Sequence, residues 1–261
     1  MAIAWHSTPV TTVAKIPTAN TATHAPNAQP NTLYIGHAIQ DHASKTKNST
    51  TDQQATWSRN NSDIPLPTPI KPERLLHYLE LINYDQNTTH FLIRGFQNGF
   101  RLGNSEETTD VHGKNASTVT ENPEVIEQKL QPEIDKGRIA GPFPHPPFSP
   151  FHISPLNIRP KKTPGKFRLI HNLSYPYDGT SINSNIPQNF KTVQYSSIGD
   201  AIKILLTLPQ GSFAAKSDIA DAFRLIPVAP VDYPKLGMYY KGAYYYDRTL
   251  PQGCSSSCQI F

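Results

Sequence analysis

Proline is the residue type that most constrains how this chain can fold. It accounts for 25 of the 261 residues, about twice its average usage in proteins. Charged residues make up only 17%. Over residues 1–69, Thr, Asn, Ala, Ser and Pro dominate, and no apolar period of 2 or 3.6 residues is sustained. This composition predicts a disordered tether over residues 1–69, closed by a polyproline II stretch at Pro65, Pro67 and Pro69.

The apolar residues are too scattered for a membrane protein. No run approaches the ~18 consecutive apolar residues of a membrane-spanning helix, and the N-terminus lacks the basic and apolar segments of a secretory signal. The two cysteines, Cys254 and Cys258, are too few for a disulfide framework or a four-ligand zinc site. We therefore expect an intracellular protein of the cytoplasm or nucleus, neither secreted nor membrane-bound, with no disulfide partner.

Charge is unevenly distributed along the chain. Residues 1–156 hold 12 Lys and Arg against 14 Asp and Glu, whereas residues 157–261 hold 12 against 6. A local excess of positive charge favours a polyanionic partner such as a nucleic acid or a nucleoside triphosphate.

The N-terminal part of the folded region is predicted to be helical. Pro72 fits the first position of an amphipathic helix of about three turns, and residues 90–103 have the spacing of a helix that is interrupted by glycines and by a turn at Asn98 and Gly99. Residues 104–120 are polar and predict a loop. Asn122 is a candidate N-cap for the next helix, and Pro123 is its expected first residue. Pro132 lies inside this helix and predicts a kink, and Gly137 is placed to end it.

Short strands dominate the remainder of the chain. After an extended Pro/Phe-rich arm, residues 154–162 and 166–174 flank Thr-Pro-Gly and predict a β-hairpin. A helix capped by Ser197 is expected to run to about Thr207, followed by a strand over 213–218. Residues 236–240 and 243–247 predict a second hairpin that turns at Lys241 and Gly242. The fold class is therefore α+β, with a mixed, mainly antiparallel sheet.

Three segments of the basic half suggest one reaction. Asp218 ends an apolar strand, where a carboxylate can hold a divalent metal ion. The segment LPQG enters a helix by a tight turn that can present a polar side chain and backbone N–H groups to a nucleotide. The hairpin RPKKTPGKFR offers Lys161, Lys162, Lys166 and Arg168 to phosphate groups.

Several segments resemble a known family in their order and spacing: GRIAGPF, SPLNIRPKKTPGKFRLIHNLSYP, KSDIADAFRLIPV, YYYDRTLPQG and SSSCQIF. They resemble the fingers and palm of reverse transcriptases, which are RNA-directed DNA polymerases, and most of all those of DIRS-type retrotransposons that carry a tyrosine recombinase. The resemblance extends back through PTPIKPERL, NGFRLG and PEVIEQKL and covers residues 67–261. It implies a partial right-hand polymerase: a disordered tether over 1–69, a helical lead-in over 70–141, and truncated fingers and palm over 142–261.

The resemblance also implies a reaction and its participants. The family transfers deoxynucleotides to a primer by a two-metal mechanism with Mg²⁺ or Mn²⁺, on an RNA or DNA template. Asp218 matches its first catalytic, metal-binding aspartate. Phe223 matches the aromatic steric gate that excludes a ribose 2′-OH. Asp221 and Ala222 belong, with residues 219 and 220, to the turn whose backbone N–H groups hold the triphosphate.

Four further residues match nucleotide-binding positions of the family. Gln252 matches the residue that supports the incoming nucleotide and the template base, and Gly253 allows close approach. Lys161 and Arg168 resemble the fingers residues that reach the phosphates, although Lys162 and Lys166 are alternatives to Lys161.

Each assignment has a simpler structural alternative. Asp218 would cap the turn that follows it, Phe223 would be a packed core aromatic, Asp221 a surface residue, and Lys161 a solvated lysine. Similarly, His171 is either a base or, more commonly, a hydrogen-bonded structural histidine.

Two other groups of residues are expected to be structural. Cys254 and Cys258 are expected to be buried and reduced. The Tyr-rich hairpin over residues 239–246 can stack bases, but sheet packing is the favoured interpretation.

The sequence departs from the family pattern in one respect. The family needs a further carboxylate from an aromatic-x-Asp-Asp hairpin, whereas this chain contains no Asp-Asp pair and ends at Phe261. We therefore expect the chain on its own to be inactive as a nucleotidyltransferase. The alternatives are a non-catalytic nucleic-acid-binding remnant of a retroelement, or a truncated gene model.

Overall fold

A computed structural model of the chain describes residues 12–15, 65–216 and 218–261. Most of the predicted tether lies outside these residues. The chain divides into two compact units, one formed by 1–40 and 194–221 and the other by 41–193 and 222–261. Each unit is described by itself.

The described residues of the first unit form one strand pair and one helix. Strand β1 (Thr12–Lys15) pairs antiparallel with β7 (Phe213–Lys216), a pairing that the sequence did not predict. Helix α6 (Ile198–Thr207) begins as expected at Ser197, whose hydroxyl accepts a hydrogen bond from the Asp200 N–H in a capping box.

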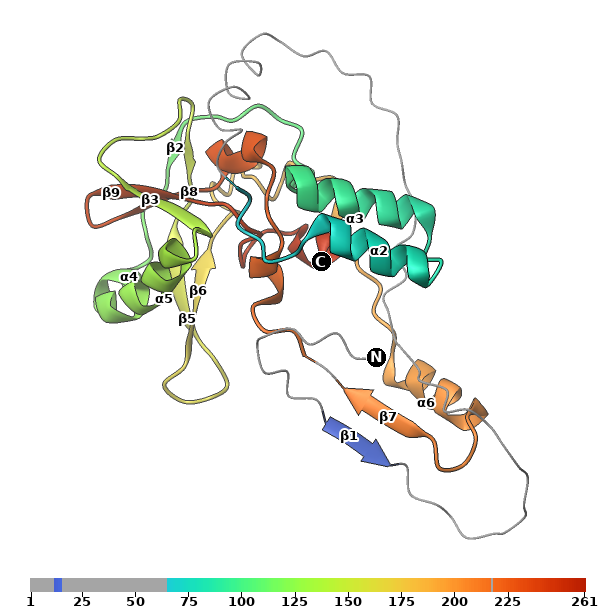
Figure 1. The fold of residues 1–261 in the computed structure, drawn as a ribbon. Coiled ribbons are helices and arrows are strands. Elements are labelled where there is room, and N and C mark those ends of the chain that lie inside the picture. Colours follow the sequence, from blue (N-terminus) through green and yellow to red (C-terminus); the bar gives the residue numbers. More distant parts are fainter. Residues whose placement is uncertain (1–11, 16–64, 217) are drawn as a thin grey trace. The chain divides into compact units, whose positions relative to one another are not determined.

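The second unit begins with two helices in contact, α2 (Pro72–Leu81) and α3 (Gln86–Asn98) (Figure 1). The predicted start at Pro72 is confirmed. Helix α3 starts earlier than predicted because the Asp85 carboxylate accepts from the Thr88 N–H at 2.7 Å and caps it. It ends at Gly99, which has φ of +84°.

Two further helices follow, α4 (Ser117–Glu121) and α5 (Pro123–Asp135). The predicted loop over 104–120 is therefore wrong at its C-terminal end. Asn122 does not cap α5 with its side chain, because its Nδ2 group donates to the Thr118 carbonyl oxygen at 2.9 Å instead. Helix α5 continues through Pro132 and ends before Gly137, which has the positive φ expected of a terminating glycine.

A five-stranded mixed sheet forms the centre of this unit. Its strands are β2 (Val111–His112), β4 (His152–Ile153), β8 (Gly237–Tyr240), β9 (Ala243–Asp247) and β3 (Ile139–Phe143), in that order. The β2–β4 and β4–β8 pairs are parallel, and the β8–β9 and β9–β3 pairs are antiparallel. The predicted turn between β8 and β9 is confirmed, with positive φ at Lys241 and Gly242.

The first predicted hairpin is also confirmed, as a separate two-stranded ribbon of β5 (Leu156–Pro160) and β6 (Phe167–His171). Asn115 connects this ribbon to the sheet. Its Nδ2 group donates to the Tyr239 carbonyl oxygen at 2.8 Å, and its Oδ1 atom accepts from the Leu156 N–H at 2.9 Å.

Short helical turns complete the unit: η1 (Gln188–Phe190), η2 (Ala222–Leu225), η3 (Pro230–Lys235) and α7 (Ser257–Ile260).

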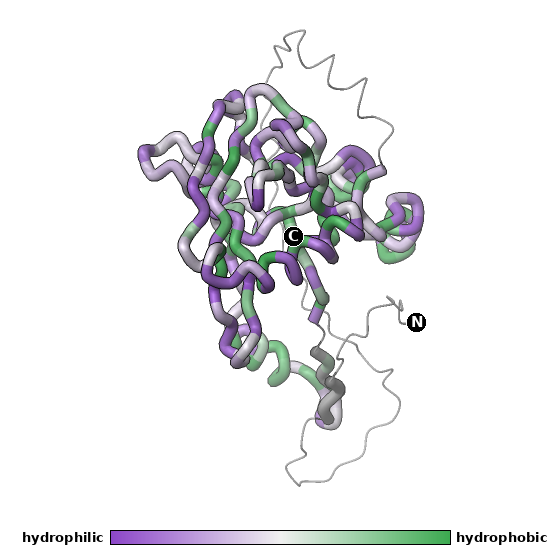
Figure 2. The backbone as a smooth tube through the Cα atoms, turned by 90° about the vertical axis from the view of Figure 1, so that its left-hand side faces the viewer, coloured by the Kyte–Doolittle hydropathy of each residue, from purple (hydrophilic) through white to green (hydrophobic). Residues whose placement is uncertain are grey.

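Apolar side chains of the second unit form two buried clusters. The larger contains Leu102, Leu173, Val228 and Leu250, and the smaller lies around Ile126, Leu156 and Met238. Hydrophobic residues are distributed along the described backbone in short stretches (Figure 2). None of the helices described is both long and apolar enough to cross a membrane.

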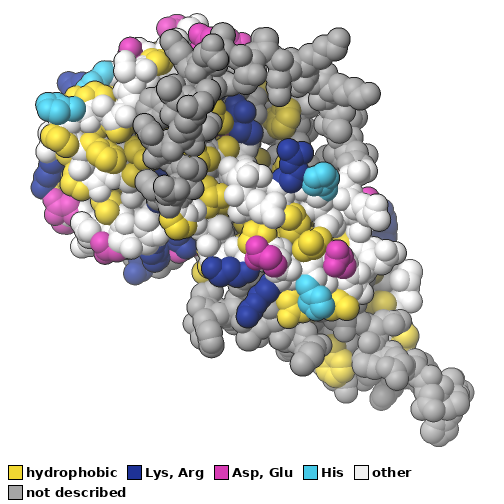
Figure 3. Space-filling model, turned by 45° about the horizontal axis from the view of Figure 1, so that its top comes forward, with side chains coloured by type: hydrophobic (Ala, Val, Ile, Leu, Met, Phe, Trp, Pro, Cys, Tyr) yellow, Lys and Arg dark blue, Asp and Glu magenta, His cyan; other side chains and the backbone are white. Residues whose placement is uncertain are grey.

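The surface also carries apolar groups. Large exposed side chains lie on α2, on α3 and in the turn between them: Tyr78, Leu81, Ile82, Tyr84 and Phe91. Exposed apolar side chains lie among charged ones on the face drawn in Figure 3.

Candidate functional site

The β5–β6 ribbon carries an exposed group of basic side chains at its tip. Arg159 on β5 lies directly opposite Arg168 on β6, and the tip is closed by a hydrogen bond of 2.7 Å from the Lys161 N–H to the Lys166 carbonyl oxygen. We call the five residues the basic tip: Arg159, Lys161, Lys162, Lys166 and Arg168. All five are exposed. None of them forms an ion pair with a carboxylate of a described residue.

Like charges placed directly opposite in an antiparallel pair destabilise it. The basic tip therefore concentrates positive charge at a position where the fold gains nothing from it. Lys161 and Arg168, the two residues matched to phosphate-contacting positions, both lie here. Phosphate binding by them stays a prediction.

Phe223 lies in the short turn η2 of the second unit. Its ring is half-buried, packs against the larger apolar cluster and makes an edge contact with the Phe261 ring at a centroid distance of 5.9 Å. The residues that follow bond to the chain after β9: the Leu250 N–H donates to Ile226, and the Val228 N–H donates to Arg248. The core-aromatic interpretation and the steric gate are both compatible with this packing.

The turn at Gln252 and Gly253 packs directly on the end of β6. The His171 N–H donates to the Gln252 carbonyl oxygen at 3.1 Å. A Cβ atom on Gly253 would lie 2.0 Å from the His171 carbonyl oxygen, and Gly253 has φ of +133°. The close approach that requires glycine here is therefore an approach to the protein backbone. The Gln252 side chain is exposed.

Asn183 fixes the same turn from the other side. Its Nδ2 group donates to the Gly253 carbonyl oxygen at 2.8 Å, and its Oδ1 atom accepts from the Ser255 N–H at 2.8 Å. Because the backbone on both sides of Gly253 is bonded, the turn presents Gln252 in a defined position.

Beneath these turns lies a group of ionisable residues that we call the buried ion network: His171 and Asp247, which are buried, and Glu133 and Arg224, which are partly buried. Arg224 donates through Nε to Glu133 Oε2 at 2.8 Å and through Nη1 to Asp247 Oδ1 at 2.6 Å. The other Asp247 oxygen, Oδ2, lies 3.2 Å from His171 Nδ1. The network connects α5, β6, β9 and the turn that carries Phe223.

Mutual attraction keeps Asp247 and Arg224 charged despite their burial. Burial alone would raise the pKa of Asp247, but the Arg224 guanidinium and the His171 ring outweigh it and lower that pKa. Burial opposes the charge of Arg224, but the carboxylates of Asp247 and Glu133 outweigh it and raise the pKa of Arg224. Asp247 and Arg224 therefore form an ion pair that is enclosed by protein.

His171 has a structural role in this arrangement. The ring is 3% exposed, and both nitrogens face acceptors, since Nε2 lies 3.0 Å from the Gly237 carbonyl oxygen. The interpretation of His171 as a hydrogen-bonded structural histidine is confirmed, because both ring nitrogens lie within hydrogen-bond distance of protein oxygens.

Asp218 and Asp221 belong to the first unit, and both are exposed. Asp221 has a left-handed backbone, with φ of +54°. Within the described part of the chain, no three His, Cys, Asp or Glu side chains gather as a metal site would require. The described residues thus do not complete the two-metal site that the family resemblance implies.

The predictions for the cysteines and for the Tyr-rich hairpin are confirmed, except at Cys258. Cys254 is buried, and burial raises the pKa of its thiol. Cys258 is exposed, so the expectation of two buried cysteines is wrong for it. The tyrosines of the β8–β9 hairpin pack a sheet face as favoured, with Tyr240 and Tyr246 buried in the two clusters.

The sequence reasoning missed the buried ion network. Arg224 stands in the apolar segment AFRLIPV, and Asp247 follows three tyrosines. A charged residue inside an apolar run needs a buried partner of opposite charge. This signal identifies both residues as paired, although it does not say with which partner.

No protein-family model matches the chain, and a search of curated proteins finds no match. Among solved structures, the chain is similar to the crystal structure of a prototype foamy virus protease-reverse transcriptase mutant, with 14% identity over 78% of this chain and a TM-score of 0.43.

Two further similar structures are of the foamy viral protease-reverse transcriptase in complex with double-stranded DNA. Both have 14% identity, with TM-scores of 0.43 and 0.42 over 76% and 81% of this chain. The chain spans between 28% and 42% of the length of the three structures. A similarity of this size carries no argument about activity.

Proposed function

We propose that this chain is part of a reverse transcriptase of a DIRS-type retrotransposon and that its basic tip binds the phosphates of a nucleic acid or a deoxynucleoside triphosphate. One observation carries the proposal most directly: five exposed cationic side chains converge on a two-stranded ribbon and have no acidic partner among the described residues. Sequence motifs in family order support the polymerase assignment.

A polyanion would relieve the repulsion within the basic tip. Arg159 and Arg168 are cross-strand neighbours, and a phosphate between them would accept charge-assisted hydrogen bonds from both guanidinium groups. Lys161, Lys162 and Lys166 add positive charge at the turn. Each phosphate contact releases condensed counterions, so binding would weaken as salt concentration rises.

The proposed reaction is template-directed transfer of a deoxynucleotide to a primer. In it Asp218 would hold Mg²⁺ or Mn²⁺, which supplies activation of the attacking hydroxyl and charge neutralisation when bound. Asp221 and Ala222 would lie along the triphosphate, and Phe223 would exclude a 2′-hydroxyl. Gln252, presented by the fixed Gly253 turn, would support the nucleotide.

The binding proposal is tested by charge reversal at the basic tip. A variant with Lys161, Lys162 and Arg168 changed to Glu is titrated with a dye-labelled template-primer duplex at several salt concentrations. We expect affinity to fall by at least about tenfold at low salt and the salt slope to flatten, because about three phosphate contacts are lost.

The matched control reverses three exposed basic residues elsewhere, Lys71, Arg74 and Lys129. It changes the net charge by the same amount and should weaken binding much less. Equal loss in the two variants would show that net charge alone attracts the nucleic acid and would contradict a site at the tip.

Catalysis is tested by primer extension on RNA and DNA templates with Mg²⁺ or Mn²⁺. Because the sequence has no Asp-Asp pair, we expect no incorporation by the purified chain above that of an Asp218→Ala variant. Synthesis that depends on Asp218 would refute the expected inactivity and would allow Phe223→Ala to be tested for use of ribonucleotides.

The second candidate function is non-catalytic nucleic-acid binding, which the basic tip alone supports. It predicts that Asp218→Ala leaves binding unchanged while tip reversal weakens it, and that a deoxynucleoside triphosphate does not strengthen the complex. A triphosphate-dependent increase in template-primer affinity would favour the polymerase proposal instead.

A further inference from the structure

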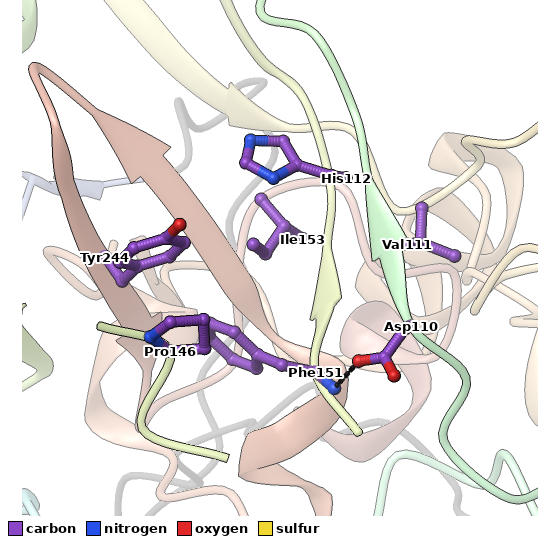
Figure 4. Close-up of a pocket in the computed structure, with 7 residues that line it drawn as sticks. All are labelled: Asp110, Val111, His112, Pro146, Phe151, Ile153 and Tyr244. Atoms are coloured by element: carbon purple, nitrogen blue, oxygen red, sulfur yellow. Dashed lines mark hydrogen bonds between the residues drawn. The ribbon is translucent and has the colours of Figure 1, made fainter. Parts of the chain in front are cut away.

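A cavity lies between strands β2, β4 and β9. It has a volume of about 260 Å³ and is open to solvent (Figure 4). The lining residues come from β2 and the residue before it, the loop before β4, β4 and its neighbour, and β9: Asp110, Val111, His112, Pro146, Phe151, Ile153 and Tyr244.

The walls of this cavity are largely aromatic and apolar. Phe151 and Ile153 are buried and form its interior surface. Figure 4 shows the rings of Tyr244 and Pro146 on one side and β2 on the other. The His112 ring is held by edge contacts with the rings of Tyr239 and Tyr244, at centroid distances of 5.0 and 6.4 Å. These contacts orient the rings of His112 and Tyr244, which both line the cavity.

Asp110 places a carboxylate at the edge of this aromatic cavity. Its Oδ1 atom accepts a hydrogen bond from the Phe151 N–H at 2.8 Å, as drawn in Figure 4. Its Oδ2 atom has no hydrogen bond to any residue that the structure describes. The carboxylate is therefore fixed in orientation and retains an oxygen that can accept from a ligand.

The charge around the cavity is opposite to that of the basic tip. The loop that leads into β2 carries Glu106 and Glu107 besides Asp110, and all three are exposed. Neither lysine nor arginine lines the cavity. Asp110 is the acidic residue among those that line the cavity, and its charge repels the phosphates of a nucleic acid and attracts a cation.

From this combination we propose that the cavity binds a cationic side chain, arginine in particular, presented by a basic peptide segment of a protein partner. Aromatic rings attract a cation over their faces, and a nearby carboxylate supplies charge-assisted hydrogen bonds. A guanidinium group satisfies both, because it is planar, stacks on a ring and donates in a fixed fork. The volume suits one long side chain and is below the usual range of small-molecule sites.

The test uses a dye-labelled tetra-arginine peptide titrated into the full chain, with fluorescence anisotropy as the readout. Asp110→Asn removes the charge and keeps an oxygen that can accept from the Phe151 N–H. Tyr244→Leu removes the aromatic face and keeps an apolar side chain. We expect each variant to bind the peptide about tenfold more weakly, the scale of one cation–π contact or one charge-assisted hydrogen bond.

The matched control is Glu107→Gln, which makes the same charge change on the same loop outside the cavity. We expect it to alter affinity less than about twofold. Losses of equal size in Asp110→Asn and Glu107→Gln would overturn the proposal, because they would show attraction by the loop charge alone. Thermal unfolding of each variant establishes that the fold is kept, and a tetra-lysine peptide measures the preference for arginine.

A single-stranded oligothymidylate provides the opposing outcome. If it binds with a dependence on Tyr244 and the peptide does not, the cavity accepts a base and the proposal is wrong. The inference does not depend on the proposed function, since reversal of Lys161, Lys162 and Arg168 should leave peptide binding intact. A failure at the cavity and a failure at the basic tip are therefore separable.

Discussion

The two ends of the β5–β6 ribbon differ in how their charged side chains are paired and buried. At one end, His171 is buried and bonds to Asp247, which also bonds to Arg224. At the other end, Arg159 and Arg168 face each other across the ribbon in solvent, and no described carboxylate pairs with either. The strands that connect these ends are only five residues long.

The difference separates charge that maintains the fold from charge that is available to a ligand. A buried ion needs its partner, because desolvation is repaid only by a close opposite charge. An exposed ion pays little desolvation, so leaving it unpaired costs little, apart from repulsion by its neighbours. The buried end of the ribbon, at His171, therefore contributes to the stability of the fold. The basic tip can be changed with little effect on that stability.

The largest effect is expected at the buried end. Asp247→Ala leaves Arg224 and His171 buried without their shared carboxylate, and should lower the free energy of unfolding by about 3–5 kcal/mol. Urea denaturation followed by circular dichroism measures this loss. The control is Glu127→Ala, which breaks the exposed ion pair with Lys241 and should cost about 0.5 kcal/mol or less. Similar losses in both variants would mean that burial does not distinguish the two pairs.

The next largest effect is expected from a backbone contact at the same end. Gly253→Ala places a methyl group 2.0 Å from the His171 carbonyl oxygen, so the turn must move, at a cost of about 1–3 kcal/mol. Gly165→Ala at the tip also has positive φ but meets nothing within 4 Å and should cost about 1 kcal/mol. Thermal unfolding of both variants measures the difference, and a larger loss for Gly165→Ala would contradict the contact.

The stability of the chain is expected to depend on pH through the buried ring of His152. Burial lowers the pKa of His152, partly opposed by the hydrogen bond to the Tyr175 carbonyl oxygen, with His171 adding to the lowering. The unfolded chain therefore takes up this proton first. Stability should fall as pH decreases below about 6.5, with a slope of at most about 1.4 kcal/mol per pH unit.

Urea denaturation between pH 8 and 5 measures this slope. His152→Gln, which keeps a donor for Tyr175, should flatten the profile over that range. An unchanged profile in this variant would assign the pH dependence to another group.

The smallest expected effect is a gain in stability, in contrast to the losses above. Arg168→Glu replaces the repulsion across the ribbon by an attraction to Arg159 and should stabilise the chain by about 0.2–1 kcal/mol, while it weakens nucleic-acid binding. Arg168→Gln should lie between Arg168→Glu and the original chain in both measurements. A loss of stability in Arg168→Glu would show that Arg168 has a structural partner.

Local signals in the sequence predict most of the elements but not how they associate. Pro72, Pro123 and Ser197 mark the starts of helices because each acts within one turn of chain. Lys241 and Gly242 mark a hairpin for the same reason. Strand β2 was missed because its two residues have no period of their own and gain their hydrogen bonds from β4, about forty residues away.

The candidate site was predictable to a similar degree. The positive charge of the ribbon can be counted in the sequence, and the hairpin that exposes it follows from its turn. The pairing of Arg224 with Asp247 and Glu133 cannot be predicted in this way, because it depends on how η2, β9 and α5 pack. The cavity beside Asp110 has the same origin, since its walls come from segments far apart in the chain.

The connection made by Asn115 has a consequence for covalent modification. Asn115, Ala116 and Ser117 form an Asn-x-Ser acceptor pattern for N-linked glycans. The nitrogen to which a glycan would be attached already donates to Tyr239, and the oxygen of the same amide accepts from Leu156. A sugar on this nitrogen would replace one of its two hydrogens and leave the other to donate to Tyr239. We therefore expect glycosylation at Asn115 to weaken the connection between the ribbon and the sheet.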